Sequence, residues 1–328
     1  MKLLVTGGDG FIGSNFILRV LKNFPKFEII NLDAEFYGSN KLSLAEILNS
    51  DKYNFVKGNI NDTLIIDRLV SDCDAVVNFA AESFVDRSIA QAKPFLKSNI
   101  DGVFTILESI KKHKKKLVQI STDEVFGSLS TQSASENFQY NPSSPYAATK
   151  ACAEMLVNSY HVTFDCDVLI TRCTNNYGPR QFPEKLIPKT ILLATNKKKI
   201  PVYGTGKNLR DWLYVDDHCD AILSVLQHGK SGQSYNISSD NEIDNLTIIN
   251  KILSIMGKSD DLIEFVEDRP GHDFRYSMDS TKLKKELNWK PKINFEVGLK
   301  NTIDWYVTNP QWWQNLSENI FEHTPWKK

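Results

Sequence analysis

The sequence predicts an α/β protein with a doubly wound, Rossmann-like parallel sheet and a smaller C-terminal, substrate-binding lobe. Short apolar runs alternate with amphipathic segments through the first half of the chain, an order typical of βαβ units. A glycine-rich loop follows the first run. After about residue 175, Pro and Gly interrupt the pattern often, which indicates a second lobe. We therefore expect one domain over 1–175, with 211–240 returning to it, and a second lobe over 176–210 and 241–328.

Six apolar runs read as strands of the sheet. Each run is short and nearly continuous in apolar residues, as expected when helices cover both faces of a parallel sheet. In chain order, the predicted strands are Lys2–Thr6, Glu28–Leu32, Asn54–Lys57, Ala75–Asn78, Leu117–Ser121 and Asp167–Arg172.

Amphipathic segments between these strands predict the covering helices. The basic run at 111–116 is interpreted as a solvated helix end, because cations suit a helix C-terminus; a binding patch is the alternative. The Ser-, Asn- and Pro-rich stretch Gly127–Pro145 predicts a loop over the site at the end of the fifth strand. The predicted helices are Ser14–Lys22, Thr63–Ser71, Pro94–Lys112 and Tyr146–His161.

Composition excludes several classes of protein. The chain has 328 residues, of which 41% are hydrophobic and 24% charged, and its formal net charge is −1. This charge provides no basic field for nucleic acid, and no apolar run approaches the ~18 residues of a membrane helix. The five cysteines form no CxxC pair, and the six histidines show no metal-ligand spacing. We expect free thiols, no metal and a cytoplasmic location.

The glycine loop predicts a dinucleotide site. Gly7, Gly10 and Gly13 are spaced GxxGxxG between the first strand and the first helix. Glycines permit the tight turn and bring backbone N–H groups close to a pyrophosphate at a helix N-terminus. Asp33, at the end of the second strand, can accept hydrogen bonds from the adenosine ribose and repel a 2′-phosphate. No Arg follows it directly, so NAD is favoured over NADP; a turn that only caps the helix is the alternative.

Candidate catalytic residues lie at the end of the predicted fifth strand and on the helix that follows. Thr122, Asp123 and Glu124 end that strand, where open α/β sheets bind ligands. Tyr146 and Lys150 are four residues apart and share one helix face. An ammonium beside a phenol favours the phenolate, so this pair can supply a base near neutral pH. The alternatives are strand-end surface charge for the carboxylates and a simple helix-face contact for Tyr146 and Lys150.

Together these motifs resemble the extended short-chain dehydrogenases/reductases that act on nucleotide sugars. Within that family, the segment Ser121–Gly127 is similar to the dTDP-glucose 4,6-dehydratases, whereas the related epimerases and decarboxylases lack the Asp-Glu pair. The resemblance extends over nearly the whole chain. Four residues depart from the family pattern: Phe84 stands where His is usual, Phe126 where Tyr is usual, Asn59 where Asp is common and Ser98 where Thr is usual.

The resemblance implies a role for each residue of the catalytic set. Tyr146 takes the O4 proton while C4 of the glucose gives hydride to NAD⁺, Lys150 lowers the tyrosine pKa, and Thr122 binds near O4. Glu124 removes the C5 proton, and Asp123 protonates the departing O6. Hydride then returns to C6. An ionised base and a protonated acid must coexist, and repulsion between like charges favours that state.

The resemblance also implies the binding residues. Tyr146 and Lys150 contact the cofactor too, and small residues after the fourth strand let it lie against the backbone. Arg210 and Arg269 suit a diphosphate. The remaining cofactor contacts are Phe11, Ile12, Asn59, Ile60, Phe79, Ala80, Ala81 and Ser98; the nucleotide-sugar contacts are Glu82, Ser83, Asn175, Lys185, Leu186, Pro201, Tyr203, Arg210, Asn245, Arg269 and His272.

Several questions stay open at this stage. UDP-glucose is a rival substrate, because one methyl group in a pocket is worth only ~1–3 kcal/mol. A 4-epimerase would leave Asp123 and Glu124 idle, and an NAD-binding sensor would leave the whole catalytic set idle. Family members usually dimerise through two helices, which predicts a homodimer through Pro94–Lys112 and Tyr146–His161. Apolar stripes on these helices would equally suit packing on their own sheet.

Overall fold

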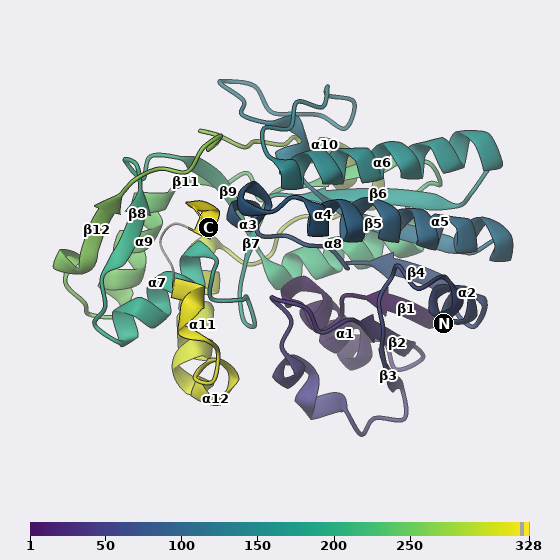
Figure 1. The fold of residues 1–328 in the computed structure, drawn as a ribbon, viewed down its shortest axis with the longest axis horizontal. Coiled ribbons are helices and arrows are strands. Elements are labelled where there is room, and N and C mark those ends of the chain that lie inside the picture. Colours follow the sequence, from purple (N-terminus) through teal and green to yellow (C-terminus); the bar gives the residue numbers. More distant parts are fainter. Residues whose placement is uncertain (322–324, 328) are drawn as a thin grey trace.

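A seven-stranded parallel sheet forms the centre of the computed structural model, which describes residues 1–321 and 325–327 (Figure 1). Its strand order is β10-β6-β5-β4-β1-β2-β3. The chain starts at the middle of the sheet and extends to both sides, which confirms the doubly wound arrangement. The strands are β1 (Lys2–Thr6), β2 (Glu28–Asp33), β3 (Tyr53–Lys57), β4 (Ala75–Asn78), β5 (Lys116–Thr122), β6 (Val168–Cys173) and β10 (Ser234–Ile237).

The first six strands lie within one residue of their predicted ends. β4 is buried along its whole length, and in β1 only Lys2 is partly exposed. Both faces of the sheet are therefore covered, which is why the strands read as continuous apolar runs. Leu3 of β1 is paired with Ile29 of β2 and Ala75 of β4.

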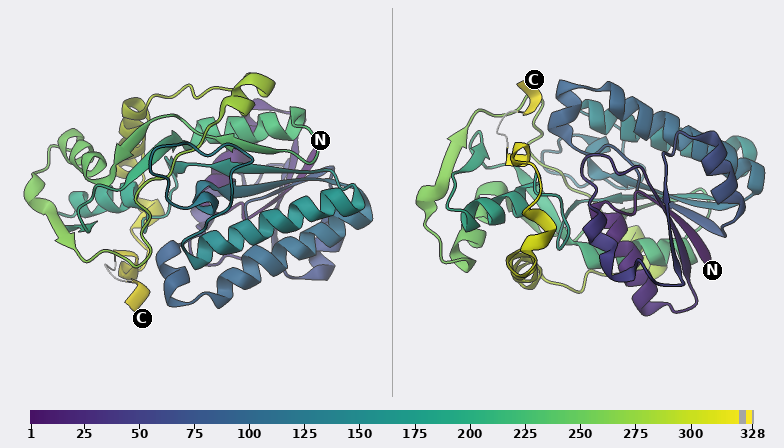
Figure 2. Two further views of the ribbon diagram at one scale, coloured as in Figure 1. Left: turned by 90° about the horizontal axis from the view of Figure 1, so that it is seen from above. Right: turned by 60° about the horizontal axis from the view of Figure 1, so that its bottom comes forward.

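Helices form a layer on each face of this sheet (Figure 2). One layer contains α1 (Phe11–Asn23) and α8 (Val215–His228), which contact each other. The other contains α2 (Thr63–Ser71), α5 (Gly102–His113) and α6 (Pro145–Phe164), packed in that order. Two apolar clusters fill the spaces between the sheet and its two helical layers.

The predicted helix over 94–112 is interrupted. It consists of α4 (Lys93–Leu96), a π-helical turn at Lys97–Asp101, and α5. In this turn the Asn99 amide bonds the backbone N–H and C=O of Glu82 at 2.9 and 3.0 Å and donates to the Thr149 hydroxyl at 2.9 Å. The π turn thus ties the helix to the segment after β4 and to α6. As predicted, the basic run ends α5, with Lys114 in the left-handed conformation.

A smaller lobe lies beside the C-terminal edge of the large sheet, at the left of Figure 1. A three-stranded sheet has the order β11-β9-β7, and β12 pairs with β8. β10 and α8 belong to the large domain, whereas β9 belongs to the small sheet. The elements are β7 (Asn175–Tyr177), β8 (Ile200–Tyr203), β9 (Leu209–Tyr214), β11 (Glu242–Asp244), β12 (Ile263–Val266), α7 (Leu186–Thr195), α9 (Asn245–Ile255), α10 (Thr281–Leu287), α11 (Phe295–Thr308) and α12 (Pro310–Trp313).

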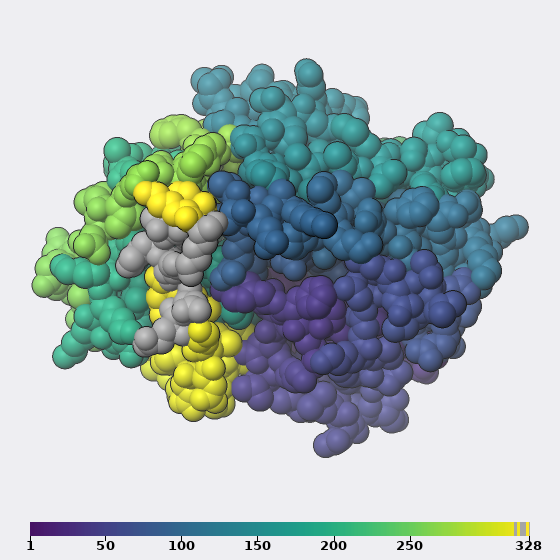
Figure 3. All heavy atoms as spheres, in the orientation of Figure 1, coloured from purple at the N-terminus to yellow at the C-terminus, as the bar shows by residue number. Residues whose placement is uncertain are grey.

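The described C-terminal turn, at residues 325–327, lies at the junction between the two lobes (Figure 3). The 3₁₀ turn Pro325–Lys327 packs against α3 (Val85–Ala90), which belongs to the large domain. The Trp326 ring meets Tyr203 of the small lobe edge-on, with the ring centres 5.2 Å apart. Within the described residues, no helix is long and apolar enough to cross a membrane, and all five cysteines are free thiols.

Candidate active site

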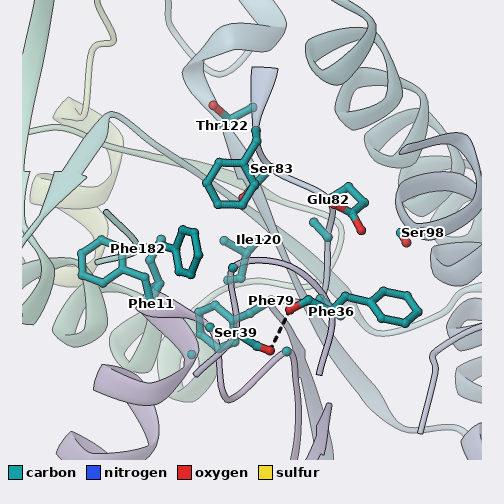
Figure 4. Close-up of a pocket in the computed structure, with 18 of the residues that line it drawn as sticks. Phe11, Phe36, Ser39, Phe79, Glu82, Ser83, Ser98, Ile120, Thr122 and Phe182 are labelled. Carbon is teal, nitrogen blue, oxygen red and sulfur yellow. Dashed lines mark hydrogen bonds between the residues drawn. The ribbon is translucent and has the colours of Figure 1, made fainter. Parts of the chain in front are cut away.

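A cavity of about 290 Å³ opens at the C-terminal edge of the large sheet (Figure 4). Residues at the ends of β1, β2, β4, β5 and β6 line it, together with the start of α1 and one face of α6. Figure 4 shows Phe11 and Phe79 on its wall, with Ser83 and Thr122 at one end. This is the edge at which open α/β sheets bind ligands.

The glycine loop forms part of this cavity and fits a dinucleotide. Gly7 has φ of 71°, and a Cβ there would lie 2.7 Å from the Ala80 backbone. A Cβ on Gly13 would lie 2.4 Å from the Gly7 carbonyl oxygen. α1 begins at Phe11 with no side-chain cap, so its first N–H groups remain available for a pyrophosphate.

Asp33 stands beside the glycine loop, at the end of β2. Its carboxylate accepts hydrogen bonds from the backbone N–H of Asp9 at 3.0 Å and of Glu35 at 2.7 Å. Burial raises its pKa, and these two N–H bonds oppose the rise. The carboxylate retains lone pairs that can accept ribose hydroxyls.

Every residue predicted to contact the cofactor lines this one cavity. The structure thus brings together groups from the first half of the chain that are far apart in sequence. They are Gly7, Gly10, Phe11, Ile12, Gly13, Asp33, Asn59, Ile60, Phe79, Ala80, Ala81, Ser98, Tyr146 and Lys150.

Thr122, Asp123 and Glu124 meet the cavity where β5 ends and a 3₁₀ turn begins. The Thr122 hydroxyl donates to Asp123 Oδ1 at 3.1 Å and accepts from the Glu124 backbone N–H at 3.3 Å. The other carboxylate oxygens, Asp123 Oδ2 and Glu124 Oε2, are buried without a hydrogen-bond partner in the described part of the chain. Both carboxyl groups can therefore receive a bound ligand.

The two carboxyl groups have different electrostatic surroundings. Burial, together with the charge of Glu124, raises the pKa of Asp123 to about 8. Burial raises the pKa of Glu124 as well, but the positive charges of Arg269, Lys185 and Arg210 oppose that rise. Near neutral pH this arrangement favours a protonated Asp123 beside an ionised Glu124, one acid and one base.

The prediction that Lys150 lowers the pKa of Tyr146 is wrong for this structure. Burial and the negative charge of Glu124 raise the phenol pKa well above its ordinary value. The Lys150 ammonium instead donates to the Ile120 carbonyl at 2.6 Å, and burial lowers its pKa to about 8. The expectation considered the lysine charge but omitted burial and the two carboxylates.

A second cavity of about 170 Å³ adjoins the first. Phe84, Asn175 and Lys185 line both. The predicted nucleotide-sugar residues are divided between the two cavities. Glu82 and Ser83 line the first, Asn175 and Lys185 line both, and the second is also lined by Leu186, Pro201, Tyr203, Arg210, Asn245, Arg269 and His272.

Contacts within the protein hold the cations of this second cavity in place. The Arg210 guanidinium donates to the Leu209, Phe274 and Asp273 carbonyl oxygens at 2.7 to 3.2 Å and stacks on Tyr276. The Lys185 ammonium donates to the Ser83 carbonyl at 2.9 Å. Burial is the main cause that lowers the pKa of both groups. Fixed cations of this kind suit an anionic ligand.

Sequence reasoning missed several residues that line the cavities, among them Cys173, Asp86 and Glu184. Cys173 ends β6 directly beside Thr122, and its place at the end of the neighbouring parallel strand was a usable signal. Asp86 and Glu184 line the second cavity. Nothing in the local pattern distinguished these carboxylates from surface charge.

The loop after Phe126 lies elsewhere than predicted. None of residues 127–144 lines either cavity. Ala134 instead bridges to Met278, and Leu129 donates its N–H to the Arg275 carbonyl. The loop turns away because Leu129, Ala134 and Met278 share an apolar cluster with Val125 and Phe126.

Known proteins are similar to this chain over nearly its whole length. A sequence model of the family described as GDP-mannose 4,6 dehydratase matches residues 4–302. The low-salt glycan biosynthesis protein Agl12 of Haloferax volcanii is 48% identical over 94% of this chain and 99% of its own. A dTDP-glucose 4,6-dehydratase of Mycobacterium tuberculosis is 44% identical over 97% of each chain.

A solved structure shares the fold over almost the full length. It is the crystal structure of dTDP-glucose 4,6-dehydratase from Streptomyces venezuelae, which has NAD bound. The TM-score is 0.95 at 42% identity, and the match covers 97% of this chain and 100% of that one.

Proposed function

The chain belongs to the GDP-mannose 4,6 dehydratase family, and on that premise we propose that it is an NAD-dependent dTDP-glucose 4,6-dehydratase. The observation that carries the proposal is the pair of adjacent carboxyl groups, the buried Asp123 and the half-buried Glu124, beside Tyr146 and Lys150 in one cavity. Relatives at 42–44% identity over nearly the full chain are dTDP-glucose 4,6-dehydratases, which supports this substrate over other nucleotide sugars.

The proposed reaction converts dTDP-glucose to dTDP-4-keto-6-deoxyglucose with loss of one water. C4 is oxidised and C6 is reduced, so the reaction has no net oxidation. Tyr146 accepts the O4 proton, and Thr122 holds O4. Glu124 removes the C5 proton and later returns one, while Asp123 protonates the departing O6. The opposed surroundings of the two carboxyl groups support this division of roles, and each such proton transfer contributes roughly 10²–10⁴-fold to the rate.

NAD fits the first cavity, and when bound NAD⁺ accepts the hydride and NADH returns it. The glycine loop would hold the pyrophosphate, and Asp33 the adenosine ribose. The phenolate of Tyr146 needs a positive charge nearby, because burial and Glu124 hold its pKa high. Lys150 and the cationic nicotinamide ring are the groups that would supply this charge.

We assign the two parts of the chain different ligands. Residues 1–175, with 211–240, would hold NAD, and 176–210 with 241–328 would hold the nucleotide sugar. Arg210 and Arg269 would meet the diphosphate, and Tyr203 would line the base pocket. This assignment is supported by the second cavity, which the small lobe lines with these three residues.

Three other functions remain distinguishable by experiment. UDP-glucose 4,6-dehydration uses the same chemistry and differs in one methyl of the base. A nucleotide-sugar 4-epimerase would have no use for Asp123 and Glu124. An NAD-binding sensor would have no use for Tyr146 either.

Turnover with identified products tests the proposal. The protein is incubated with dTDP-glucose or UDP-glucose, and the products are measured by mass spectrometry. We expect loss of one water from dTDP-glucose without consumption of added NAD. Conversion to a galactose isomer of unchanged mass would overturn the proposal in favour of epimerisation. No turnover of either nucleotide sugar despite bound NAD would favour the sensor.

We also propose a cytoplasmic homodimer that contacts neither nucleic acid nor membrane. The α4–α5 segment and α6 would form the dimer interface, because they lie side by side and present large apolar side chains to solvent. The pair is visible at the right of Figure 1. These exposed side chains are Leu96, Phe104, Met155, Val162 and Phe164.

A further inference from the structure

Asp86 lies in the first turn of α3 and lines the second cavity. Its helix belongs to the large domain, directly after the segment that follows β4. The side chain is only 14% exposed. A carboxylate so deeply placed requires partners, because burying an unpaired charge is costly.

Both partners of Asp86 come from the small lobe. Its Oδ1 accepts from Arg269 Nη1 at 2.7 Å, and its Oδ2 accepts from the Tyr203 hydroxyl at 3.1 Å. Arg269 lies on the loop after β12, and Tyr203 ends β8. One carboxylate thus fixes a cation and a phenol on two separate elements, both of which line the second cavity.

Arg269 retains an N–H donor that none of the described residues satisfies. A guanidinium carries five N–H donors in a rigid plane. One bond, to Asp86, sets the direction of that plane, and Nε is buried with no partner among the residues that the structure describes. A phosphate oxygen is a suitable acceptor for such a donor. Arg210 and Lys185 line the same cavity, so the site retains positive charge although Asp86 is negative.

We propose that Asp86 is a positioning residue, which orients Arg269 to receive the diphosphate of the nucleotide sugar and holds Tyr203 at the base pocket. The inference rests on the proposed function, because that function supplies the diphosphate ligand. Asp86 acts through Arg269 and does not itself meet the phosphates, which its negative charge would repel. Its removal should therefore impair recognition of the second phosphate in particular.

Binding of dTDP and dTMP tests this role without any requirement for turnover. Dissociation constants are measured by calorimetry with the NAD-loaded protein, and the ratio of the dTMP to the dTDP constant gives the discrimination for the second phosphate. In Asp86→Asn, which keeps the side-chain volume, we expect this ratio to fall about tenfold, the loss of roughly one charge-assisted hydrogen bond. For dTDP-glucose, we expect KM to rise more than kcat falls.

A double-mutant cycle isolates the path through Arg269. In the Arg269→Ala background, Asp86→Asn should cause no further loss of discrimination. Tyr203→Phe, which removes the other bond to Asp86 and keeps the ring, should cause a smaller loss than Asp86→Asn. Glu267→Gln, on the loop that carries Arg269, is the matched control: this acid pairs with Lys327 of the C-terminal turn at 2.5 Å and lines neither cavity.

The outcomes separate this inference from the proposed function. If wild type binds dTDP but Asp86→Asn weakens dTDP and dTMP equally, Asp86 is only structural and the inference is overturned. An unchanged ratio of the dTMP to the dTDP dissociation constant also overturns the inference. So does a further loss of discrimination when Asp86→Asn is added to Arg269→Ala. If the wild-type protein binds no nucleoside diphosphate at all, the proposed function fails first. Retained NAD binding verifies that each variant is folded.

Discussion

At the scale of single residues, Asp123 and Glu124 are neighbours in sequence but not equivalent in charge. The rise in the pKa of Asp123 follows from burial and from Glu124. Three cations oppose the same effect at Glu124. All three, Lys185, Arg210 and Arg269, lie in the small lobe, so the position of this lobe beside the end of β5 helps to differentiate the acid from the base.

The proposed division of roles predicts the behaviour of Glu124→Gln. The amide cannot remove the C5 proton, whereas C4 oxidation needs only Tyr146 and Lys150. We expect overall turnover to fall by at least about 10²-fold, while NADH fluorescence on the enzyme rises when dTDP-glucose is added. Asp123→Asn is the comparison, because it removes the acid and leaves the base. An unchanged overall rate in Glu124→Gln would show that Glu124 is not the base.

Asp9, in the glycine loop, predicts a pH-dependent stability. Burial and the charge of Asp33 raise its pKa to about 7. A carboxyl group whose pKa is higher in the folded protein binds more protons there, so its contribution lowers stability as pH rises from about 4 to about 7. Asp9→Asn, which can still accept from Asn31 Nδ2, removes this contribution. The quantity compared is the free energy of unfolding of Asp9→Asn minus that of wild type. We expect this difference to be roughly 2 kcal/mol larger at pH 8 than at pH 4.

Urea unfolding at a series of pH values measures that difference. Asp62→Asn is a control, because Asp62 caps α2 and lies outside the glycine loop. Asparagine caps a helix about as well as aspartate, so this variant should keep the stability of wild type. A difference between Asp9→Asn and wild type that stays constant with pH would contradict the prediction.

Residue identities were easier to predict than residue charges. All predicted cofactor and catalytic residues line one cavity, because parallel strands end at a common edge and the chain order places each side chain there. The pKa of Tyr146 was predicted in the wrong direction. Burial depends on the whole fold, and no local spacing of Tyr and Lys encodes it.

At the scale of elements, apolar run length predicted the strands well. All six predicted strands match within one residue, since both faces of the sheet are buried and each strand ends where the apolar run ends. The π-helical turn at Lys97–Asp101 was missed. It depends on the Asn99 amide, which bonds Glu82 and Thr149, and such long-range partners leave no periodic signal.

The turn into α1 predicts the effect of Gly13→Ala. The added methyl would lie 2.4 Å from the Gly7 carbonyl oxygen, so the loop must move away from the pyrophosphate position. Overpacking of this kind costs about 1–3 kcal/mol, and we expect NAD affinity to fall at least about tenfold. Calorimetric titration with NAD measures the change.

Gly257→Ala is the matched control for that substitution. Unlike Gly13, Gly257 has positive φ, at 61°, and nothing lies within 4 Å of its added Cβ. The variant should lose about 1–2 kcal/mol of stability, because an L-residue disfavours this conformation, and it should keep its NAD affinity. Equal loss of NAD affinity in both variants would show that general destabilisation, rather than contact with Gly7, is responsible.

At the scale of the whole molecule, the frequent Pro and Gly after about residue 175 predicted two lobes, but the sequence did not predict how the lobes contact each other. The junction depends on side chains far apart in the chain: Asn15 of α1 donates to the Pro179 carbonyl at 2.9 Å and accepts from the Arg180 guanidinium at 3.4 Å. Arg87 likewise pairs with Glu184 at 2.9 Å. Such polar contacts have no pattern in sequence, so the assembled cleft could be located only by the fold.

The proposed homodimer can be tested on the outer face of α6. Met155 there is 53% exposed, and a carboxylate at this point would be buried without a partner if α6 forms the interface. We expect Met155→Glu to weaken association by at least about 2 kcal/mol and to sediment as a monomer at concentrations where wild type is a dimer. Val307→Glu on α11 is the control, since Val307 is similarly exposed, at 56%, and lies in the small lobe. A monomeric wild type would refute the homodimer, and a dimeric Met155→Glu would place the interface on another face.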